Sequence, residues 1–486
     1  MLKDAATGAV WLGLSQWLVR FLGVFSIIIL ARYLSASDYG VMALINISVS
    51  FLETVLVLGI GRFIIAKQSL TTDDLNTAWT FNVLKMIFIG SALFLIAPLI
   101  GEFYDTPDLV LPIKLISVSI MIGGFENISA DILKKELKFN RVSIYIITPK
   151  LIGSIVNIAL AVLLESYWAL VYGTIAIRIT SLIVSYFIHP FRPKFSFKSK
   201  NEIWEFSKLS LGSNFAIFIK NKLDSILIGK YYSSEELGSY TMAQTVASIP
   251  STEVTTPVIG SLIPSLSKNK KYPREYIENV TRGLQIVSLI VWPACFGLLT
   301  ISSEFVDIAL SSKWETITLY LPILTLILSV DVIAGYSKQI LILEGKLLFA
   351  VKCEWILVIY YIFSFPLAMY YTSIDMMLYF KLISSIVMGI AFFYRVSKCL
   401  NFNIRQALYQ VLSSFFACIL IYYLAFVMKE YFAFDSSLMS LTFSFIFWLV
   451  VYPVIIYLFW FFIGKPNTIE KLILTFLLKK NRCSDN

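Results

Sequence analysis

Long apolar runs recur along the whole 486-residue chain, and many reach the roughly 18–20 residues that a helix needs to cross a bilayer. Hydrophobic residues make up 58% of the chain and charged residues 15%, against about 45–50% and about 25% in soluble domains. The pattern predicts an all-α polytopic membrane protein whose first run remains as a span and is not cleaved as a signal peptide. We expect about fourteen spans, at 8–31, 39–66, 79–100, 110–131, 142–164, 167–189, 207–231, 237–264, 280–302, 316–343, 350–371, 374–397, 404–428 and 438–463.

The stretch from Ser213 to Gly238 repeats an earlier part of the chain. A shift of 198 positions places Gly40 on Gly238 and Asp38 on Glu236. Each copy is an apolar helix with an aromatic and basic end, followed by a Ser-rich turn that has an acid just before a glycine. The repeat predicts two parallel six-helix lobes with two additional helices after them. The expected divisions are an N-terminal lobe at 1–189, a cytoplasmic loop at 190–206, a second lobe at 207–397, two helices within 398–464 and a cytoplasmic tail at 465–486.

Basic residues concentrate in alternate loops, starting with the N-terminus. One such loop holds Lys134, Lys135, Lys138 and Arg141, whereas the opposite loops are rich in acids. The positive-inside rule therefore predicts that both termini are cytoplasmic, which requires an even number of spans. Anionic lipid headgroups of the inner leaflet suffice to explain the net charge of +9, without a nucleic-acid partner.

Several ionisable residues fall inside the predicted spans, where each costs on the order of 2.5–3.5 kcal/mol at a helix centre. Such residues usually face a bundle interior or a water-filled cavity. We expect a cationic, substrate-binding cavity lined by Arg20, Lys150, Arg178, Lys220 and Lys222. Charge partners or ion-coupling residues are then Glu53, Asp224, Glu253 and Asp331, with Glu126 in the inner half of its span.

The cations within the spans outnumber the acids by nine to five when Arg62, Lys85, Lys338 and Lys381 are counted, which lie near span ends and can snorkel. This balance suits an anionic cargo and disfavours a pump of cationic drugs. Lys220 and Asp224 lie four residues apart on one helix face. Two interpretations stay open for them: a structural salt bridge, or one wall of a central cavity.

Proline and glycine mark weak points in the second helix of each repeat. Pro250, Pro257 and Pro264 recur every seven residues, and the shift of 198 positions places Pro257 on Gly59. Proline removes a backbone donor and kinks a helix. We interpret these four residues as candidate gating kinks, although prolines that are merely tolerated in a membrane are common.

Nothing in the sequence indicates a metal, a cofactor or an enzyme. The five cysteines have no metal-ligand spacing, and His189, the single histidine, precedes a proline at a predicted helix end. No outer loop is longer than about fifteen residues, and Asp73-Asp74 stands where a helix cap is expected. A scaffold for a synthesis complex would leave the intramembrane charges unexplained.

Three stretches resemble a known family: ILARYLSASDYGVMAL (29–44), LKKELKFNR (133–141) and LIPSLSK (262–268). They are similar to the Wzx-type, colanic-acid-exporter-like polysaccharide flippases of the multidrug/oligosaccharidyl-lipid/polysaccharide exporter superfamily. The resemblance implies an alternating-access transporter of the bacterial inner membrane. It would move an undecaprenyl-diphosphate-linked oligosaccharide to the outer leaflet for O-antigen, capsule or exopolysaccharide synthesis.

The same resemblance implies further properties. It places basic residues on the first and seventh helices, here Arg20, Lys220 and Lys222. It implies a proton or sodium ion, or the membrane potential, as the energy source. A polysaccharide polymerase complex is a conceivable partner, and a bundle of this size can work as a monomer. Alternative cargoes are lipid II or a teichuronic-type precursor, and another alternative is a cation-coupled small-molecule antiporter.

Overall fold

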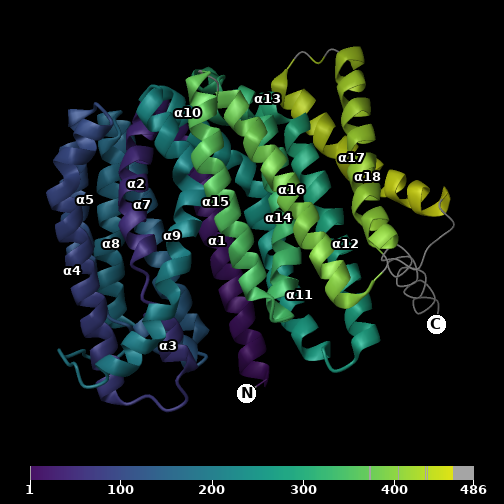
Figure 1. Cartoon of the computed structure of the whole chain (residues 1–486). Helices are drawn as coiled ribbons and strands as arrows, with labels where there is room; N and C mark the ends of the chain where they lie inside the picture. The colour runs from purple at the N-terminus through teal and green to yellow at the C-terminus, as the bar shows by residue number, and fades with distance from the viewer. Residues whose placement is uncertain (1, 372–373, 403, 433, 435, 463–486) are drawn as a thin grey trace, which may run out of the picture. The chain divides into compact units, whose positions relative to one another are not determined.

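The computed structural model describes residues 2–371, 374–402, 404–432, 434 and 436–462, and every regular element within these ranges is helical (Figure 1). Ten of the described helices are long and apolar enough to cross a membrane, and one bent pair raises this number to eleven. The predicted class, an all-α multi-pass membrane protein, is confirmed. The count of fourteen spans stays a prediction, and the predicted tail at 465–486 lies outside the described residues.

The chain forms two compact units, Met1–Thr241 and Met242–Asn486. In the first unit, α4 packs on α5, α5 on α8, α8 on α7 and α7 on α1, while α2 packs on α9. Its helices are α1 (Leu2–Tyr33), α2 (Ala36–Val55), α3 (Ile60–Ala66), α4 (Thr72–Phe103), α5 (Val110–Gly123), α6 (Ser129–Lys135), α7 (Phe139–Leu164), α8 (Trp168–Phe187), α9 (Lys200–Tyr231) and the start of α10 (Ser234–Ser248). The compact units divide within α10, so the repeat boundary at 190–206 stays a prediction.

In the second unit, α12 packs against α14 and α17, α14 against α16, and α17 against α18. The long helices are α11 (Thr256–Asn269), α12 (Pro273–Thr300), α14 (Ile317–Leu343), α15 (Leu347–Tyr370), α16 (Ile374–Leu400), α17 (Ile404–Phe432) and α18 (Ser437–Phe462). A single turn, α13 (Ser302–Phe305), and a π-helical segment (Val306–Leu310) follow α12.

The predicted span 237–264 is not one regular helix. It consists of α10, a π-helical segment (Ile249–Thr255) and α11. Pro250 lies in the π-helical segment, Pro257 in the first turn of α11 and Pro264 inside α11. Prolines interrupt the regular hydrogen-bond ladder, which accounts for the change of helix type. Whether these residues gate a transport path stays a prediction.

The repeated Ser-acid pattern forms a helix cap in both copies. The Ser35 hydroxyl accepts the amide of Asp38 at 3.2 Å, and the Asp38 carboxylate accepts the amide of Ser35 at 2.9 Å. In the second copy, the Ser233 hydroxyl accepts the amide of Glu236 at 3.2 Å. A capping box of this kind fixes where a helix begins. The cap predicted at Asp73-Asp74 is also confirmed, because Asp74 and Thr71 form such a box at the start of α4.

The repeated glycines bring the first turns of α2 and α10 into backbone contact. A Cβ atom added at Gly40 would lie 1.7 Å from the carbonyl oxygen of Ser234, and one added at Gly238 would lie 1.8 Å from that of Ala36. Ala36 and Ser234 are themselves 198 positions apart. The contact is therefore reciprocal between equivalent positions, and only glycine permits so close an approach. We call it the glycine crossing.

Gly40→Ala and Gly238→Ala are each expected to lower the melting temperature of the purified protein, because the added methyl group must displace a backbone carbonyl. Overpacking of this kind costs about 1–3 kcal/mol. Gly23→Ala is the control, because a Cβ there meets nothing within 4 Å. The double variant should lose less than the sum of the two single losses. A melting temperature equal to that of the control would contradict the crossing.

Candidate functional site

The second helix of the chain is broken. The span predicted at 39–66 consists of α2 and α3, whose axes are bent by 40° across residues 56–59. Gly59, at the start of α3, has a left-handed backbone with φ 64°. This conformation costs other residues roughly 1–2 kcal/mol, so glycine is what allows the break. Discontinuous spans are where many membrane transporters place their binding sites.

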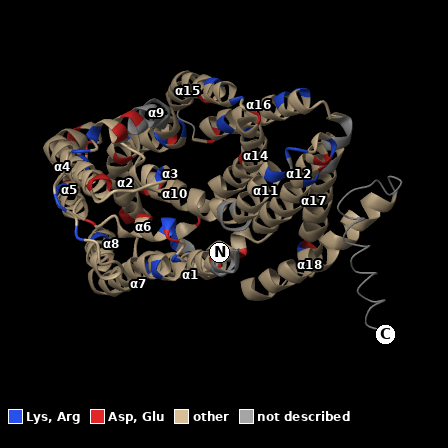
Figure 2. Cartoon of the chain, turned by 90° about the horizontal axis from the view of Figure 1, so that it is seen from below, with Lys and Arg blue, Asp and Glu red and all other residues tan. Residues whose placement is uncertain are grey.

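A cavity of about 540 Å³ lies at this break, within the first unit. Its charged lining residues come from α3, α4, the turn after α5, and α6, and they are Arg62, Lys85, Glu126, Asp131 and Lys134. Three cations against two carboxylates leave a net charge of +1. Figure 2 looks at the molecule from the end at which α3 lies, and shows basic and acidic segments close to α3 and α6. We call this space the break cavity.

Charges of alternating sign run beside the break cavity. The Arg178 guanidinium (α8) lies 2.9 Å from the Glu53 carboxylate (α2), with the two side chains 23% and 33% exposed. Lys85 interacts electrostatically with Glu53, and Arg178 with Glu126. The Tyr145 hydroxyl (α7) donates a hydrogen bond to Glu126. Five elements thus contribute to one network, which contains two of the residues that the sequence predicted, Glu53 and Arg178.

Glu126 is the carboxyl of this network that lies in a turn between helices. The sequence placed it within a continuous helical span at 110–131, whereas the structure places it in the turn between α5, which ends at Gly123, and α6, which begins at Ser129. Burial raises the pKa of Glu126, while the hydrogen bond from Tyr145 and the charge of Arg178 oppose this shift. A carboxyl with a raised pKa takes up a proton more readily as the pH falls.

Contacts to α6 hold the short helix α3 in place. A Cβ atom at Gly61 would lie 2.7 Å from the carboxylate of Asp131, so the missing side chain lets that carboxylate approach α3. Asp131 also pairs with Lys134 at 3.0 Å. The Lys135 amino group donates to the carbonyls of Ile64, at 3.1 Å, and Lys67 at the end of α3. These bonds satisfy carbonyl groups that a helix end leaves without partners.

Asp224 is fully buried away from the break cavity. Its carboxylate accepts hydrogen bonds from the hydroxyl of Tyr240 at 2.7 Å and from the amide of Ser225 at 2.6 Å. These bonds link α9 to α10 and favour a structural role over ion coupling. Lys220 and Lys222 are half-buried on the same helix.

None of the residues that the sequence predicted for substrate binding or ion coupling lines the break cavity itself, among the side chains that the structure describes; Glu53 and Arg178 lie beside it. Arg20 is half-buried on α1, Lys150 is exposed on α7 and Asp331 is exposed on α14. The side chain of Glu253 lies outside the described residues. Their roles stay predictions.

Sequence reasoning missed Asp131, Lys134 and Tyr145 as site residues. Lys134 was read only as a marker of the cytoplasmic side. The two glycines around Ile60, followed by Arg62, were the available signal, because paired glycines before a cation inside an apolar run indicate a break.

The family model described as polysaccharide biosynthesis protein matches residues 29–319. The chain belongs to this family. It is 24% identical to the lipopolysaccharide biosynthesis protein WzxC of Escherichia coli, over 72% of this chain and 70% of that protein. It is also 24% identical to the teichuronic acid biosynthesis protein TuaB of Bacillus subtilis, over 71% of this chain and 72% of that protein.

Two solved structures share the fold. The lipid II flippase MurJ, in an inward closed conformation, aligns with a TM-score of 0.72 at 15% identity, over 92% of this chain and 98% of MurJ. An inward-facing multidrug resistance transporter of the MATE family aligns with a TM-score of 0.59 at 14% identity, over 79% and 96%. The resemblance drawn from the sequence, to the flippases of this exporter superfamily, is confirmed.

Gly59→Ala is expected to destabilise the purified protein by about 1–2 kcal/mol, because alanine pays the cost of the left-handed backbone. Gly123→Ala is the matched control, since its Cβ meets nothing within 4 Å and its backbone is not left-handed. Thermal unfolding of both variants in the same membrane mimetic measures the difference. Equal stability of the two would show that residues 56–59 form no such break.

Proposed function

We propose that this protein is an alternating-access flippase that moves an undecaprenyl-diphosphate-linked oligosaccharide from the cytoplasmic to the outer leaflet, for O-antigen, capsule or exopolysaccharide synthesis. Membership of the polysaccharide biosynthesis family and a MurJ-like fold over 92% of the chain support this function. The observation that carries the proposal is the net-cationic break cavity with its charge network.

The diphosphate is the part of such a cargo that hydrocarbon excludes most strongly, because burying a bare charge is prohibitive. In our proposal, Arg62, Lys85 and Lys134 replace part of its hydration. Arg178 exchanges Glu53 for a phosphate oxygen, since a guanidinium forms paired hydrogen bonds with either group. The carboxylates keep the cationic side chains compensated when no cargo is bound.

Energy would come from a proton or sodium gradient or from the membrane potential, and 100 mV supplies about 2.3 kcal/mol for each charge moved. We place the coupling proton on Glu126, next to Arg178. Glu253 and Asp331 remain further candidates. The proposal also places both termini in the cytoplasm of a bacterial cell, with the flippase working as a monomer.

A teichuronic-type precursor is the second candidate cargo. TuaB matches this chain with the same identity, and nearly the same coverage, as WzxC. Both cargo types present the same kind of anionic headgroup to the break cavity. The MATE-like fold alone does not favour a drug antiporter, because the net charge of +1 in the break cavity disfavours a cationic drug.

Arg178→Ala is expected to abolish export in a strain that lacks the chromosomal gene, with lipid-linked repeat units accumulating in the cytoplasmic leaflet. Surface polysaccharide and membrane protein level are measured together. Glu53→Gln combined with Arg178→Gln removes both charges of the pair, so it should fold yet fail to export. Arg192→Ala is the control, because that guanidinium donates to the carbonyls of His189 and Phe191, lies over the Tyr186 ring and does not line the break cavity. Wild-type export in both Arg178 variants would refute the proposed site.

Binding of inorganic pyrophosphate is expected to tighten as the pH falls. Burial raises the pKa of Glu126, so protonation as the pH falls removes a negative charge from the break cavity. Titration calorimetry at several pH values, on wild type and Glu126→Gln, measures the effect. Pyrophosphate also changes its own protonation with pH, but this change is the same for both proteins. The ratio of their affinities at each pH therefore reports Glu126 alone.

In Glu126→Gln the side chain is neutral at every pH, so this variant should bind pyrophosphate more tightly at high pH, and the two proteins should converge at low pH. Glu102→Gln is the control, because Glu102 lies in the last turn of α4 and does not line the break cavity. A constant affinity ratio between Glu126→Gln and wild type across the pH range would rule Glu126 out.

A further inference from the structure

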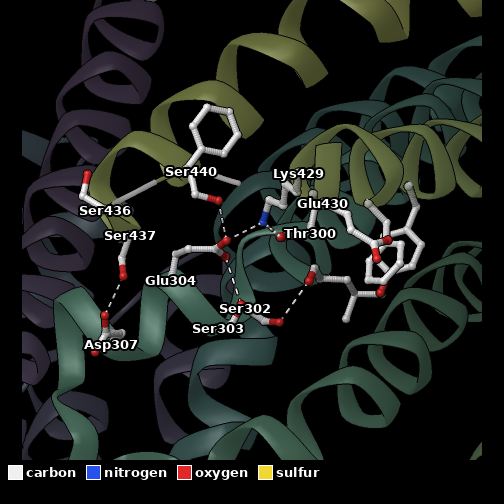
Figure 3. A pocket seen from close by; sticks show the side chains of 14 residues that line it. Thr300, Ser302, Ser303, Glu304, Asp307, Lys429, Glu430, Ser436, Ser437 and Ser440 are labelled. Carbon is white, nitrogen blue, oxygen red and sulfur yellow. Dashed lines mark hydrogen bonds and ion pairs between the residues drawn. The ribbon is translucent and has the colours of Figure 1, made fainter. Parts of the chain in front are cut away.

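A second cavity, of about 890 Å³, lies within the second unit (Figure 3). It is an open cavity lined by the end of α12, the turn α13, the π-helical segment after it and the facing ends of α17 and α18. The positive-inside assignment places these ends on the outer side of the membrane. We call this space the serine pocket.

Apolar packing fixes the frame of the serine pocket. Trp292 and Phe296 of α12 form one core with Ile421 of α17 and Trp448 of α18. The indole nitrogen of Trp448 donates to the hydroxyl of Thr300 at 2.9 Å, where α12 ends. This packing holds α17 and α18 against α12 next to the serine pocket.

One acid organises the polar side of the serine pocket. The Glu304 carboxylate accepts hydrogen bonds from Lys429 and Ser440, each at 2.6 Å. Burial of Glu304 would raise its pKa, but the bonds from Lys429 and Ser440 outweigh burial and hold the pKa below its usual range. Glu304 is therefore charged at neutral pH. Figure 3 shows Lys429 and Ser440 pointing toward it from α17 and α18.

The lining differs in chemistry from the break cavity. Three carboxylates, Glu304, Asp307 and Glu430, face one ammonium group, that of Lys429, which leaves a net charge of −2. This balance repels a phosphate or a carboxylate ligand. Hydroxyl groups supply most of the other polar atoms, and they belong to Thr300, Ser302, Ser303, Ser436, Ser437 and Ser440.

Aromatic rings form the apolar part of the lining. Tyr422 and Phe426 come from α17, and Phe434 follows it. A sugar ring has hydroxyl groups around its edge and an apolar face of C–H groups. Its hydroxyls can donate to carboxylates and exchange bonds with serines, while its apolar face covers an aromatic ring. The volume falls within the roughly 300–1,000 Å³ of small-molecule sites.

We propose that the serine pocket binds a neutral sugar residue. This inference rests on the proposed function, because an oligosaccharide cargo would bring such a sugar to the outer side of the membrane. Asp307, whose carboxylate accepts from Ser437 at 2.7 Å, and Glu430 then accept hydrogen bonds from sugar hydroxyls. The diphosphate and the sugar are thus recognised at separate places, by cavities of opposite net charge.

The test is direct binding of sugars to the full-length protein in phospholipid nanodiscs, since detergents with sugar headgroups would compete. Ligand-observed NMR with glucose, galactose, mannose, N-acetylglucosamine and N-acetylgalactosamine measures affinity. At least one neutral sugar is expected to bind saturably, and glucuronate to bind at least tenfold more weakly. Asp307→Asn and Ser437→Ala should each weaken binding at least fivefold.

Two control variants lie on the same unit outside the serine pocket. Asp375→Asn changes an exposed acid at the start of α16, and Thr442→Val changes a hydroxyl that bonds only to carbonyls within α18. Both should bind sugar as wild type does. Arg178→Ala should also bind sugar normally, although it should not export.

Absence of saturable binding for all five sugars, or equal binding by the Asp307 and Ser437 variants and wild type, would overturn the inference. Saturable binding of calcium chloride without any sugar binding would do so too, and would identify a cation site. Nanodisc binding does not depend on transport, so such a failure leaves the flippase proposal standing. Normal export by the Arg178 variants would refute the flippase site while leaving sugar binding intact.

Discussion

The glycine crossing is the backbone contact that ties the two copies of the sequence repeat together, at the first turns of α2 and α10. Gly40 and Gly238 stand at equivalent positions of the sequence repeat, and each lies against a backbone carbonyl in the other's first helical turn. A serine cap fixes the first residue of α2 and of α10, three residues before the acid of each cap. The glycine therefore occupies the same position in the first turn of both helices.

The break in the second helix turns a membrane span into the edge of a polar cavity. Gly59 allows the chain to leave α2, Gly61 allows Asp131 to approach α3, and Lys135 of α6 bonds to the carbonyls at the end of α3. Around this break, Glu53, Arg178 and Glu126 compensate one another. Their charges would be costly in hydrocarbon if isolated. Because these charges compensate one another, protonation of one carboxyl or binding of a phosphate would change the charge partners of the neighbouring side chains.

Sequence reasoning reached the class, the family and the repeat, because these depend on hydropathy, short motifs and spacing. It also selected Glu53 and Arg178, since a charge within an apolar run is conspicuous. It could not pair them, because they are 125 positions apart and meet only when α2 and α8 pack together. The sequence marked Gly59 as a weak point of the second helix, but the 40° bend between α2 and α3 came only from the structure. The sequence placed Glu304 in a loop and Ser440 at the start of a predicted span, and only the packing of α17 and α18 on α12 brings them together.

The most direct test of the account is flipping by the purified protein alone. Proteoliposomes would carry a lipid-diphosphate-linked oligosaccharide with a fluorescent sugar, and a membrane-impermeant reductant would report the leaflet that holds it. The account predicts that wild type makes the inner-leaflet fraction accessible to the reductant within minutes under a proton gradient or a membrane potential, while Arg178→Ala does not. Equal accessibility in protein-free, Arg178→Ala and wild-type vesicles would contradict it.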